Sequence, residues 1–330
     1  MIKEILPGIF QLKIPLPKNP LRTLNSYLIK GGGKNLLIDT GFNWPECKKA
    51  LLQGIADLGV DWSEVYFFIT HVHGDHSGLV YALAREDSKI FCSKTDAVIM
   101  QDCMETPYWA EVNKSFIMHG FPQEMITNQG ETMTNFISGS DLNFTFVQDG
   151  DVLEMGSYHL VCTSTPGHSP GHMCLYEPEH KFLISGDHIL AHISSNITTW
   201  PGVDDSLGQY LSSLEKVDSM DISLILPGHR ELIRDFRGRI AELKLHHKHR
   251  LEEILNILQK GTMNAYQVAS RMHWDLTYDT WEEFPSFQKW FATGETIAHL
   301  EYLAKRNMVE PIKGSGTLKY SPNRQASVLR

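Results

Sequence analysis

Four short apolar runs in this chain each lead directly into a loop that carries histidine or aspartate, and this recurrence constrains the fold more than any other feature. The runs cover residues 65–70, 159–164, 181–185 and 222–226. Short apolar runs bounded by Gly, Pro or His are typical of buried strands. The loops that follow them are HVHGDH at 71–76, TPGHSPGH at 165–172, GDH at 186–188 and PGH at 227–229. We therefore expect the four loops to meet at one edge of the sheets.

The remaining sequence up to residue 235 predicts further strands and helices. Residues 25–30 and 35–40 are β-rich and are joined by a run of three glycines and a lysine, which indicates a hairpin. Helical periodicity follows several of the strands, so the chain is predicted to be mixed α/β. Residues 93–140 are predicted to be an inserted helical lid, because they lack strand alternation. This stretch is rich in large apolar side chains, which serve either the core or the substrate: Met100, Met104, Trp109, Phe116, Met118 and Phe121.

Residues 236–330 are predicted to form a second, mostly helical domain. An apolar helical face at residues 251–258 ends before a glycine, and two more helices are indicated around residues 265–272 and 297–304. Two glycines within residues 314–316 are compatible with a terminal hairpin. Three helices followed by a hairpin are typical of a winged-helix domain.

The residue types in the four loops indicate metal binding. Imidazole and carboxylate groups are ligands of zinc and related divalent ions of the first transition row. Alternation along the first strand places His71 and His73 on one side, while Gly74 lets the chain bend so that Asp75 and His76 face a neighbouring position. Two metal ions fit this arrangement better than one.

The ordered series H-x-H-x-D-H, T-P-G-H-S-P-G-H, G-D-H and P-G-H, preceded by Asp39-Thr40-Gly41, resembles the metallo-β-lactamase superfamily of hydrolases. The resemblance spans essentially all of residues 1–230, and five ordered motifs make it specific. It implies an αββα sandwich, assigned to a catalytic domain at residues 1–235, with a dinuclear metal site. In that site His71, His73 and His168 would bind the first metal, Asp75, His76 and His229 the second, and Asp187 would bridge both.

Other residues are candidates for supporting or pocket roles. Asp39 is predicted to support the histidine loop, and His172 to orient a ligand or to pack near it. His188 and His192 follow Asp187 closely and are either pocket residues or ordinary loop residues. Arg230 stands where glycine is typical of the family, which would place a cation near the mouth of the pocket.

A run of basic and histidine residues opens the predicted tail helix. His246, His247 and Arg250 lie there with Lys248 and His249. The favoured interpretation is a solvated helix face, and the alternative is a group of residues that approaches the pocket.

Composition excludes several classes of protein. With 42% hydrophobic and 21% charged residues, the chain falls outside the disordered and fibrous ranges. No apolar run approaches the ~18 residues that a membrane span needs. The five cysteines lack C-x-x-C spacing and are expected to be small buried hydrophobes rather than disulfide or zinc ligands. An acidic residue and a proline near the start disfavour a signal peptide, so a cytoplasmic location is predicted.

The predicted chemistry is metal-dependent hydrolysis. Two divalent metal ions, zinc by default with iron or manganese also compatible, would deprotonate a bridging water and polarise the scissile bond. Asp75 is expected to orient the resulting hydroxide or accept its proton, and Asp187 to be needed for metal and activity together. A thiolate leaves without help from a protein acid, so a thioester or related small acyl substrate is favoured. This choice is similar to the activity of hydroxyacylglutathione hydrolases.

Two other function classes remain open. The tail resembles that of a lactamase-like subfamily whose eukaryotic members cut single-stranded RNA, which makes a metal-dependent endoribonuclease the first alternative. The second is a non-catalytic DNA-binding effector sensor, although residues 231–330 carry 15 basic and 12 acidic residues and so offer only a weak positive field. Arg230 favours an anionic small molecule as the partner, and a homodimer is compatible with the common two-fold symmetry of stable interfaces.

Overall fold

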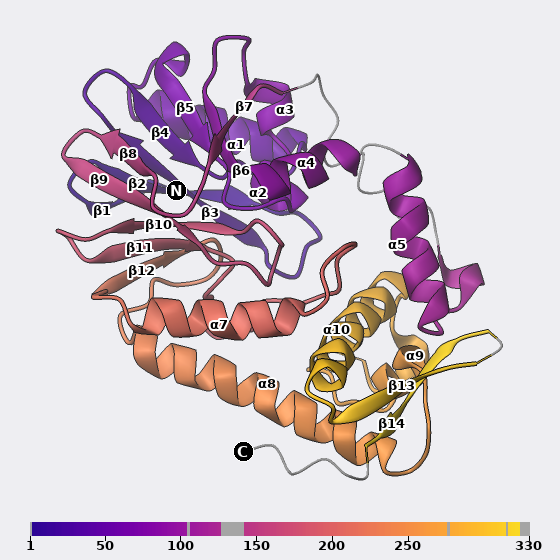
Figure 1. The fold of residues 1–330 in the computed structure, drawn as a ribbon. Coiled ribbons are helices and arrows are strands. Elements are labelled where there is room, and N and C mark those ends of the chain that lie inside the picture. Colours follow the sequence, from indigo (N-terminus) through magenta and orange to yellow (C-terminus); the bar gives the residue numbers. More distant parts are fainter. Residues whose placement is uncertain (1, 104–105, 127–141, 276–277, 315, 324–330) are drawn as a thin grey trace.

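Two β-sheets face each other in the computed structural model, and helices cover the outer face of each sheet (Figure 1). The structure describes residues 2–103, 106–126, 142–275, 278–314 and 316–323. The predicted αββα sandwich is therefore confirmed.

The first sheet contains seven strands in chain order. They are β1 (Ile2–Leu6), β2 (Ile9–Pro15), β3 (Thr23–Lys30), β4 (Asn35–Ile38), β5 (Val65–Phe68), β6 (Ile90–Ser93) and β7 (Phe144–Val147). Strands β1 to β4 pair antiparallel, and β4 to β7 pair parallel. The antiparallel pairing of β3 with β4 confirms the predicted hairpin.

The second sheet contains five strands in the order β12-β11-β10-β9-β8. Their bounds are β8 (Val152–Met155), β9 (Tyr158–Ser164), β10 (Met173–Glu177), β11 (Phe182–Gly186) and β12 (Leu224–Pro227). Strands β11 and β12 pair parallel and every residue in both is buried, as is usual for parallel strands covered on both faces. The four apolar runs that precede the histidine loops are strands β5, β9, β11 and β12, as predicted.

Helices complete the layers on both sides. Those described are α1 (Pro45–Asp57), α2 (Gly74–Ser77), α3 (Val80–Leu83), α4 (Lys94–Asp102), α5 (Thr106–Met118), α7 (Ser206–Asp218), α8 (Phe236–Leu258), α9 (Ala265–Ala269) and α10 (Ser286–Lys305). Several of these helices begin at residues that favour a helix N-terminus. Pro45 lies in the first turn of α1, and the side chains of Asp205 and Asp235 cap α7 and α8.

Three apolar clusters hold the layers together. The cluster between the sheets includes Tyr27 and Phe68 from the first sheet and Leu175 and Ile184 from the second. A second cluster packs the outer face of the first sheet against α1 and α4, and a third packs the second sheet against α7, α8 and α10. All five cysteines are free and buried, which confirms that they act as small apolar side chains.

The predicted insertion is helical where the structure describes it, because it holds α4 and α5. Met100, Phe116 and Phe121 belong to the core, Trp109 lines a cavity and Met118 is exposed. Met104 and residues 127–141 lie outside the described residues. The described large side chains of this segment are thus divided among core, cavity and surface.

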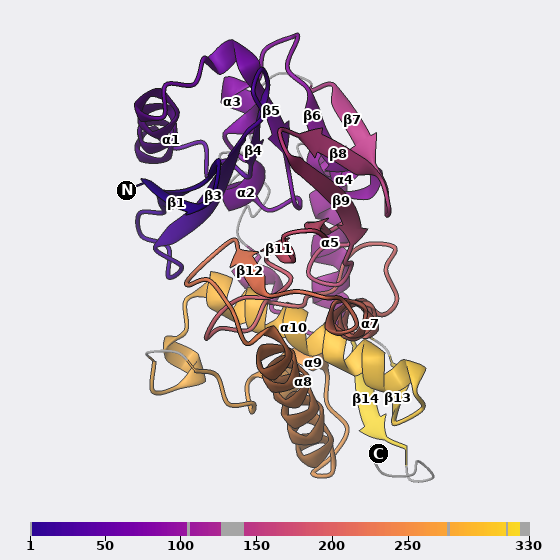
Figure 2. The ribbon, with the colours of Figure 1, turned by 90° about the vertical axis from the view of Figure 1, so that its left-hand side faces the viewer.

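The tail contains three helices and then a hairpin, β13 (Val309–Lys313) and β14 (Leu318–Pro322), in the predicted order. Helix α8 begins at Phe236, well before the apolar face at residues 251–258 that predicted it, and α10 begins at Ser286. Figure 2 shows α10 beside α7 and α8, beneath the second sheet, and α10 contacts both of these helices. The winged-helix assignment stays a prediction.

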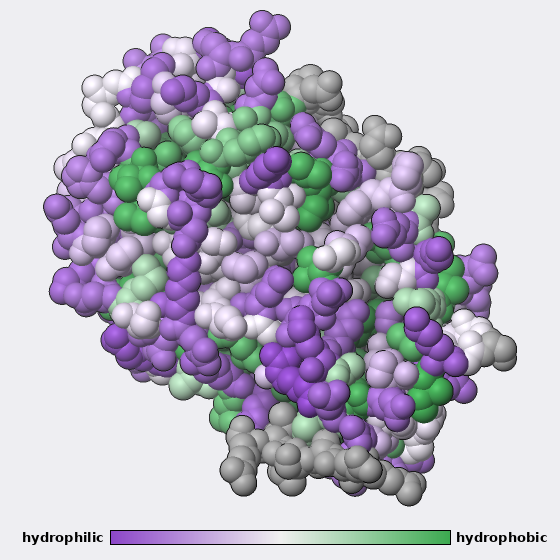
Figure 3. Space-filling model, in the orientation of Figure 1, coloured by the Kyte–Doolittle hydropathy of each residue, from purple (hydrophilic) through white to green (hydrophobic). Residues whose placement is uncertain are grey.

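The surface is mostly hydrophilic on the face shown in Figure 3, with small hydrophobic patches between polar side chains. Among the described residues, none of the helices combines the length and the apolar character that a bilayer span requires.

Candidate metal centre

The seven predicted metal ligands converge at the ends of β5, β9, β11 and β12. Their ligand atoms fall into three overlapping groups, and within each group the atoms lie within 4.8 Å of one another. The groups are His71, His73 and His168; His71, His76 and Asp187; and Asp75, His76 and His229. The four loops therefore meet at one edge, as the sequence predicts.

The loop after β5 supplies four of these side chains through a change of backbone conformation. His73 is extended, with φ −61° and ψ 142°, and the short helix α2 begins at Gly74. Asp75 and His76 lie in this helical turn and are buried. The bend predicted at Gly74 therefore separates two groups of ligands from one short sequence.

The shortest distances in the cluster are between imidazole nitrogens. His73 Nδ1 lies 3.0 Å from His71 Nε2 and 2.9 Å from His168 Nε2. His76 Nε2 lies 3.2 Å from His229 Nε2 and 3.4 Å from Asp187 Oδ1. Nitrogen lone pairs that face each other at this distance repel unless a proton or a cation lies between them.

Asp39 orients part of the cluster from the end of β4. Its backbone has a positive φ of 57°, and its carboxylate accepts hydrogen bonds from Thr70 N at 2.9 Å and Thr70 Oγ1 at 2.8 Å. The same carboxylate lies 2.7 Å from His76 Nδ1. Asp39 thus places the proton of His76 on Nδ1 and leaves Nε2 free to face the cluster.

Backbone carbonyls orient two more imidazoles in the same way. His168 Nδ1 donates to Asn196 O at 2.8 Å, and His229 Nδ1 donates to Thr23 O at 2.8 Å. His172 has a different place, because its Nε2 accepts a hydrogen bond from the backbone N–H of Asp187 at 3.2 Å. The contact places His172 beside Asp187, and its role in orienting a ligand stays a prediction.

Burial and charge set the protonation of the cluster. Burial lowers the pKa of His71 well below its ordinary value and the pKa of His73 to about 3, so both imidazoles are neutral. Burial alone would raise the pKa of Asp187 and of Asp75. Nearby imidazoles outweigh that effect, and they hold the pKa of Asp187 far below its usual range and lower that of Asp75 to about 2. The carboxylates in turn raise the pKa of His76 and His229 against the effect of burial, so positive charge on these two imidazoles balances the carboxylates, a role that a divalent cation can take.

Asp187 gives the most direct sign that a cation belongs here. Its Oδ1 is buried and has no hydrogen-bond partner among the described residues. Gly228 makes room for this carboxylate, since a Cβ at that position would lie 2.6 Å from Asp187 Oδ1 and 2.7 Å from His76 Cε1. A buried carboxylate oxygen without a donor is costly unless a cation is bound. The residues present therefore fit divalent metal ions.

Comparisons with known proteins agree with this geometry. The model of the metallo-beta-lactamase superfamily matches residues 20–229. This chain belongs to that superfamily. A solved metallo-beta-lactamase family protein from Thermus thermophilus is 30% identical with a TM-score of 0.84, and the match covers 97% of this chain and 100% of that one.

Two curated relatives of the superfamily carry more specific names. "Probable metallo-hydrolase YqjP" of Bacillus subtilis is 26% identical over 84% of this chain and 86% of its own length. Human acyl-coenzyme A thioesterase MBLAC2 is 28% identical over 69% of this chain and 80% of its own length. The predicted superfamily is therefore confirmed.

The sequence interpretation missed Asp96, which joins two loops of this metallo-beta-lactamase site. The carboxylate is buried and accepts hydrogen bonds from Val72 N at 3.0 Å, Ser169 Oγ at 2.5 Å and Gly171 N at 2.6 Å. Burial raises its pKa to about 6. Its only local signal is Ser93, three residues earlier, which caps α4.

The other loop candidates lie in different environments. His188 is fully buried against Tyr210, with ring centroids 5.3 Å apart. His192 is 81% exposed and lies 3.9 Å from Glu231, so it is a surface loop residue. Arg230 has a φ of 66° and its guanidinium donates weakly to Pro20 O at 3.4 Å. Of these three residues, only His188 is buried near the cluster, its ring centroid lying 6.1 Å from that of His172.

The solvated-face interpretation is wrong for two of the tail residues. His247 and Arg250 are buried because α10 packs against this side of α8. His247 Nδ1 donates to His299 Nε2 at 3.1 Å. Arg250 donates to Glu295 at 3.2 Å and to Glu253 at 3.3 Å, and it stacks on Trp274 at 4.0 Å.

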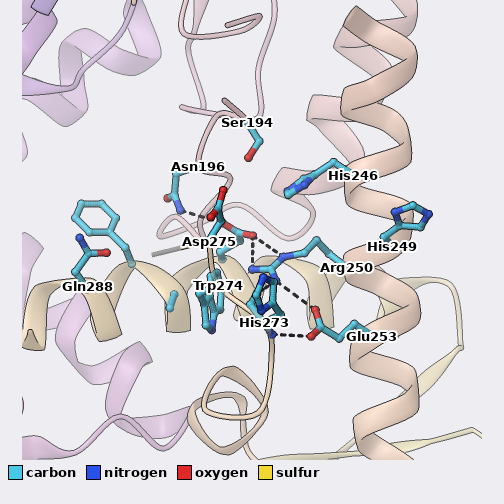
Figure 4. A pocket seen from close by; sticks show the side chains of 13 residues that line it. Ser194, Asn196, His246, His249, Arg250, Glu253, His273, Trp274, Asp275 and Gln288 are labelled. Atoms are coloured by element: carbon cyan, nitrogen blue, oxygen red, sulfur yellow. Dashed lines mark hydrogen bonds and ion pairs between the residues drawn. The ribbon is translucent and has the colours of Figure 1, made fainter. Parts of the chain in front are cut away.

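A cavity of about 600 Å³, lined mostly by polar side chains, lies between α8 and α10. Figure 4 shows His246, His249, Arg250 and Glu253 projecting from α8 at its edge. The cavity is tied to the metal cluster through Asn196, because the amide of Asn196 donates to Glu295 at 3.2 Å while its carbonyl accepts from His168. His246 and Arg250 thus line a cavity beside the site, as the alternative interpretation expected.

A second cavity, of about 90 Å³, opens beside His73 and is almost entirely apolar. Its walls come from α5, α10 and residues 198–201, and among the described residues no Asp, Glu, Lys or Arg lines it. Asn196 and Phe291 line both cavities. The metal cluster therefore adjoins two cavities, and among the described residues Asp, Glu and Arg side chains line only the larger of the two.

Proposed function

We propose that this hydrolase cleaves a small acyl thioester, using two divalent metal ions held by the seven clustered residues. Zinc is the default metal, and the imidazole and carboxylate ligands also suit iron or manganese. When bound, such ions lower the pKa of water and polarise a carbonyl oxygen, which supplies a nucleophile at neutral pH without a serine or cysteine.

The proximity of the ligand atoms supports the assignment that the family resemblance implies. His71, His73 and His168 would hold one ion, Asp75, His76 and His229 the other, and Asp187 would bridge them. The distances of 3.6 Å from Asp187 Oδ2 to His229 Nε2 and 3.8 Å to His168 Nε2 support a bridging place for this carboxylate.

The observation that carries the substrate class is the apolar cavity beside His73. An apolar cavity accommodates the acyl part of a substrate, and walls without charged side chains in the described part of the chain offer no place for a nucleic acid phosphate. The human relative is named as an acyl-coenzyme A thioesterase, which supports the same class.

The hydrolysis of a thioester needs few catalytic groups besides the metal ions. Water adds to the acyl carbon, a C–O bond forms and the C–S bond breaks, and the products are a carboxylate and a thiol. A thiolate leaves readily, so a general acid near the sulfur is unnecessary. Asp75, whose Oδ2 lies 3.3 Å from His229 Nε2, would accept the proton that the attacking water loses.

Two arginines of the tail form ion pairs within the protein, which weighs against the two alternatives. Arg250 is committed to Glu295 and Glu253, and Arg306 at the end of α10 pairs with Asp205 at 3.0 Å. These basic side chains are neutralised within the protein, so they contribute little to phosphate binding.

A direct test compares the rates of acyl thioester hydrolysis and single-stranded RNA cleavage by the purified protein, with metal content measured on the same samples. Asp187→Ala is expected to lose most bound metal and at least about 100-fold in kcat/KM for the thioester, because a central ligand is removed. Asp87→Ala removes an exposed carboxylate and is the matched control. Cleavage of RNA without thioesterase activity, or an active metal-free Asp187→Ala protein, would contradict the proposal.

A further inference from the structure

The segment of residues 187–205 connects β11 to α7 and contains no helix or strand of its own. It begins at the candidate ligand Asp187, and it contacts a second candidate, because the backbone carbonyl of Asn196 accepts a hydrogen bond from His168 Nδ1 at 2.8 Å. Next to Asn196, Ser195 Oγ donates to the backbone carbonyl of Asp187. Two adjacent residues of this segment therefore hold candidate ligands from two different loops.

Helix α10 holds Asn196 from the other side (Figure 4). The side-chain amide of Asn196 donates to Glu295 Oε2 at 3.2 Å, and Glu295 Oε1 accepts from Arg250 Nε and Nη2 at 3.2 Å each. The guanidinium of Arg250 is itself fixed, since it donates to His273 O at 2.6 Å and lies 4.0 Å from the centre of the Trp274 ring. The Glu295 side chain is only 12% exposed, and a largely buried carboxylate paired with such a guanidinium keeps one position.

Helix α8 holds the same segment at a second place through Arg239, whose side chain is 15% exposed. Its Nε donates to Leu190 O and its Nη2 to Ile193 O, both at 2.7 Å. Carbonyl groups outside helices and sheets need donors from elsewhere in the protein. The tail supplies these donors, so it fixes the backbone between Asp187 and Asn196 as well as the Asn196 side chain.

We propose that Glu295 and Arg239 are positioning residues of the metal centre. They hold the segment between Asp187 and Asn196, and this segment in turn holds His168. The inference rests on the ligand assignment in the proposed function. Among the described residues, every candidate ligand precedes residue 230, so both positioning residues raise metal affinity without touching the metal. Partners that orient ligand residues in this way typically change metal affinity about 10- to 100-fold.

Asn196→Ala tests the link to α10 most directly. The variant loses the bond to Glu295 but keeps the backbone carbonyl that accepts from His168. We expect its affinity for zinc to fall about 10-fold in a competition with a chromogenic chelator, because the carbonyl is no longer held in place. Asn143→Ala makes the same change at an exposed position before β7 and should bind zinc like the wild-type protein.

A double-mutant cycle tests whether Glu295 acts through Asn196. If it does, the protein that combines Glu295→Ala with Asn196→Ala should bind zinc as weakly as Glu295→Ala alone. Two losses that multiply in the double variant would overturn this route. Glu295→Ala also removes a partner of the buried Arg250, and if this variant fails to fold, the result for Asn196→Ala alone decides the question.

The contact with α8 is tested by Arg239→Ala and Arg239→Lys. We expect Arg239→Ala to lower zinc affinity about 10-fold, and Arg239→Lys, which keeps a cationic donor near the two carbonyls, to restore part of the loss. Arg237→Ala, at an exposed position of the same helix, is the matched control. Equal zinc affinities of Arg239→Ala and Arg237→Ala would overturn the role of Arg239.

The absorption spectrum of the cobalt-substituted protein separates positioning from a general effect on stability. Cobalt(II) absorbs visible light according to the arrangement of its ligands, so Asn196→Ala should change the bands. If this variant unfolds more easily without metal while its cobalt spectrum and zinc affinity match the wild type, the tail only stabilises the fold and the proposal is wrong.

His168→Ala is the reference variant for the ligand assignment. If it binds zinc as tightly as the wild-type protein, the ligand assignment of the proposed function fails. A loss of zinc affinity in His168→Ala with none in Asn196→Ala refutes the positioning role alone.

Discussion

At the scale of single residues, the candidate metal ligands and their neighbours Asp39 and His172 can be named from the sequence, whereas Asp96 and Asn196 cannot. The candidate ligands directly follow the ends of strands, so a short stretch of sequence is enough to predict their positions. Asp96 binds Ser169, which lies 73 positions later in the chain, and Asn196 binds His168, which lies 28 positions earlier. These contacts form only when the sheets and loops pack. The sequence predicts Thr70 to be the last residue of a strand, but it does not predict that the Thr70 hydroxyl lies 3.0 Å from His71 Nδ1.

Asp96 is predicted to matter for metal binding without touching a metal. Asp96→Asn replaces an acceptor-only oxygen with an amide that faces the N–H groups of Val72 or Gly171. We expect metal affinity to fall about 10- to 100-fold and the free energy of unfolding to fall by about 1–3 kcal/mol. Competition with a chromogenic chelator and thermal unfolding measure the two effects.

The matched control for Asp96 lies on the same helix. Asp102→Asn makes the same chemical change at the exposed end of α4, and it should alter neither quantity. Equal metal affinity in the two variants would show that Asp96 does not support the ligand loops.

At the scale of elements, strands are easier to predict than helices. Strands β5, β9, β11 and β12 are fully or largely buried, so their apolar runs stand out. Helix α8 buries Phe236 and Ile240 near its start among arginines and glutamates, and a mixed face of this kind gives a weak periodic signal. The burial of His247 and Arg250 depends on α10, which the local sequence of α8 does not contain.

The contact between α10 and residues 198–205 contains a buried acid that should make stability depend on pH. Burial raises the pKa of Glu301 to about 8, and Asp204 and Asp205 add to the effect. Its Oε1 accepts from Thr199 at 3.4 Å, and Oε2 lacks a hydrogen-bond partner among the described residues. The folded protein therefore binds a proton that the unfolded chain releases between pH 4.5 and 8, and stability falls as pH rises through that window.

Glu301→Gln should remove this dependence. Relative to the variant, the wild-type protein should lose stability by about 1.4 kcal/mol per pH unit at most between about pH 5 and 8. Unfolding by denaturant at several pH values measures the difference, and Glu310→Gln at an exposed position of β13 is the control. Parallel pH profiles for wild type and Glu301→Gln would rule the effect out.

At the scale of the whole molecule, the tail and the sandwich are joined through the site itself. His168 binds Asn196, Asn196 binds Glu295, and Glu295 binds Arg250 of α8. The superfamily model ends at residue 229, so this connection joins the part of the chain that the model matches to the tail that follows it. The composition of the tail is visible in the sequence, but its attachment to His168 is not.

Removal of metal is predicted to destabilise the whole protein. A ligand present at about 100 times its dissociation constant stabilises the folded state by about 2.7 kcal/mol, and chelation removes this stabilisation. Without the cation, the buried carboxylates of Asp75 and Asp187 also lose a counter-charge. We expect dialysis against a chelator to lower the melting temperature by about 5–10 °C and zinc to restore it. An unchanged melting temperature in protein shown to be metal-free would contradict this coupling.

Helix α10 is a wall of both cavities, with Phe291 shared between them, while every candidate metal ligand comes from the ends of strands far earlier in the chain. Part of the lining of both cavities is therefore encoded in a short segment that holds none of the candidate metal ligands. A library of variants confined to the codons for residues 286–294 would sample new substrates with the chemical apparatus left in place.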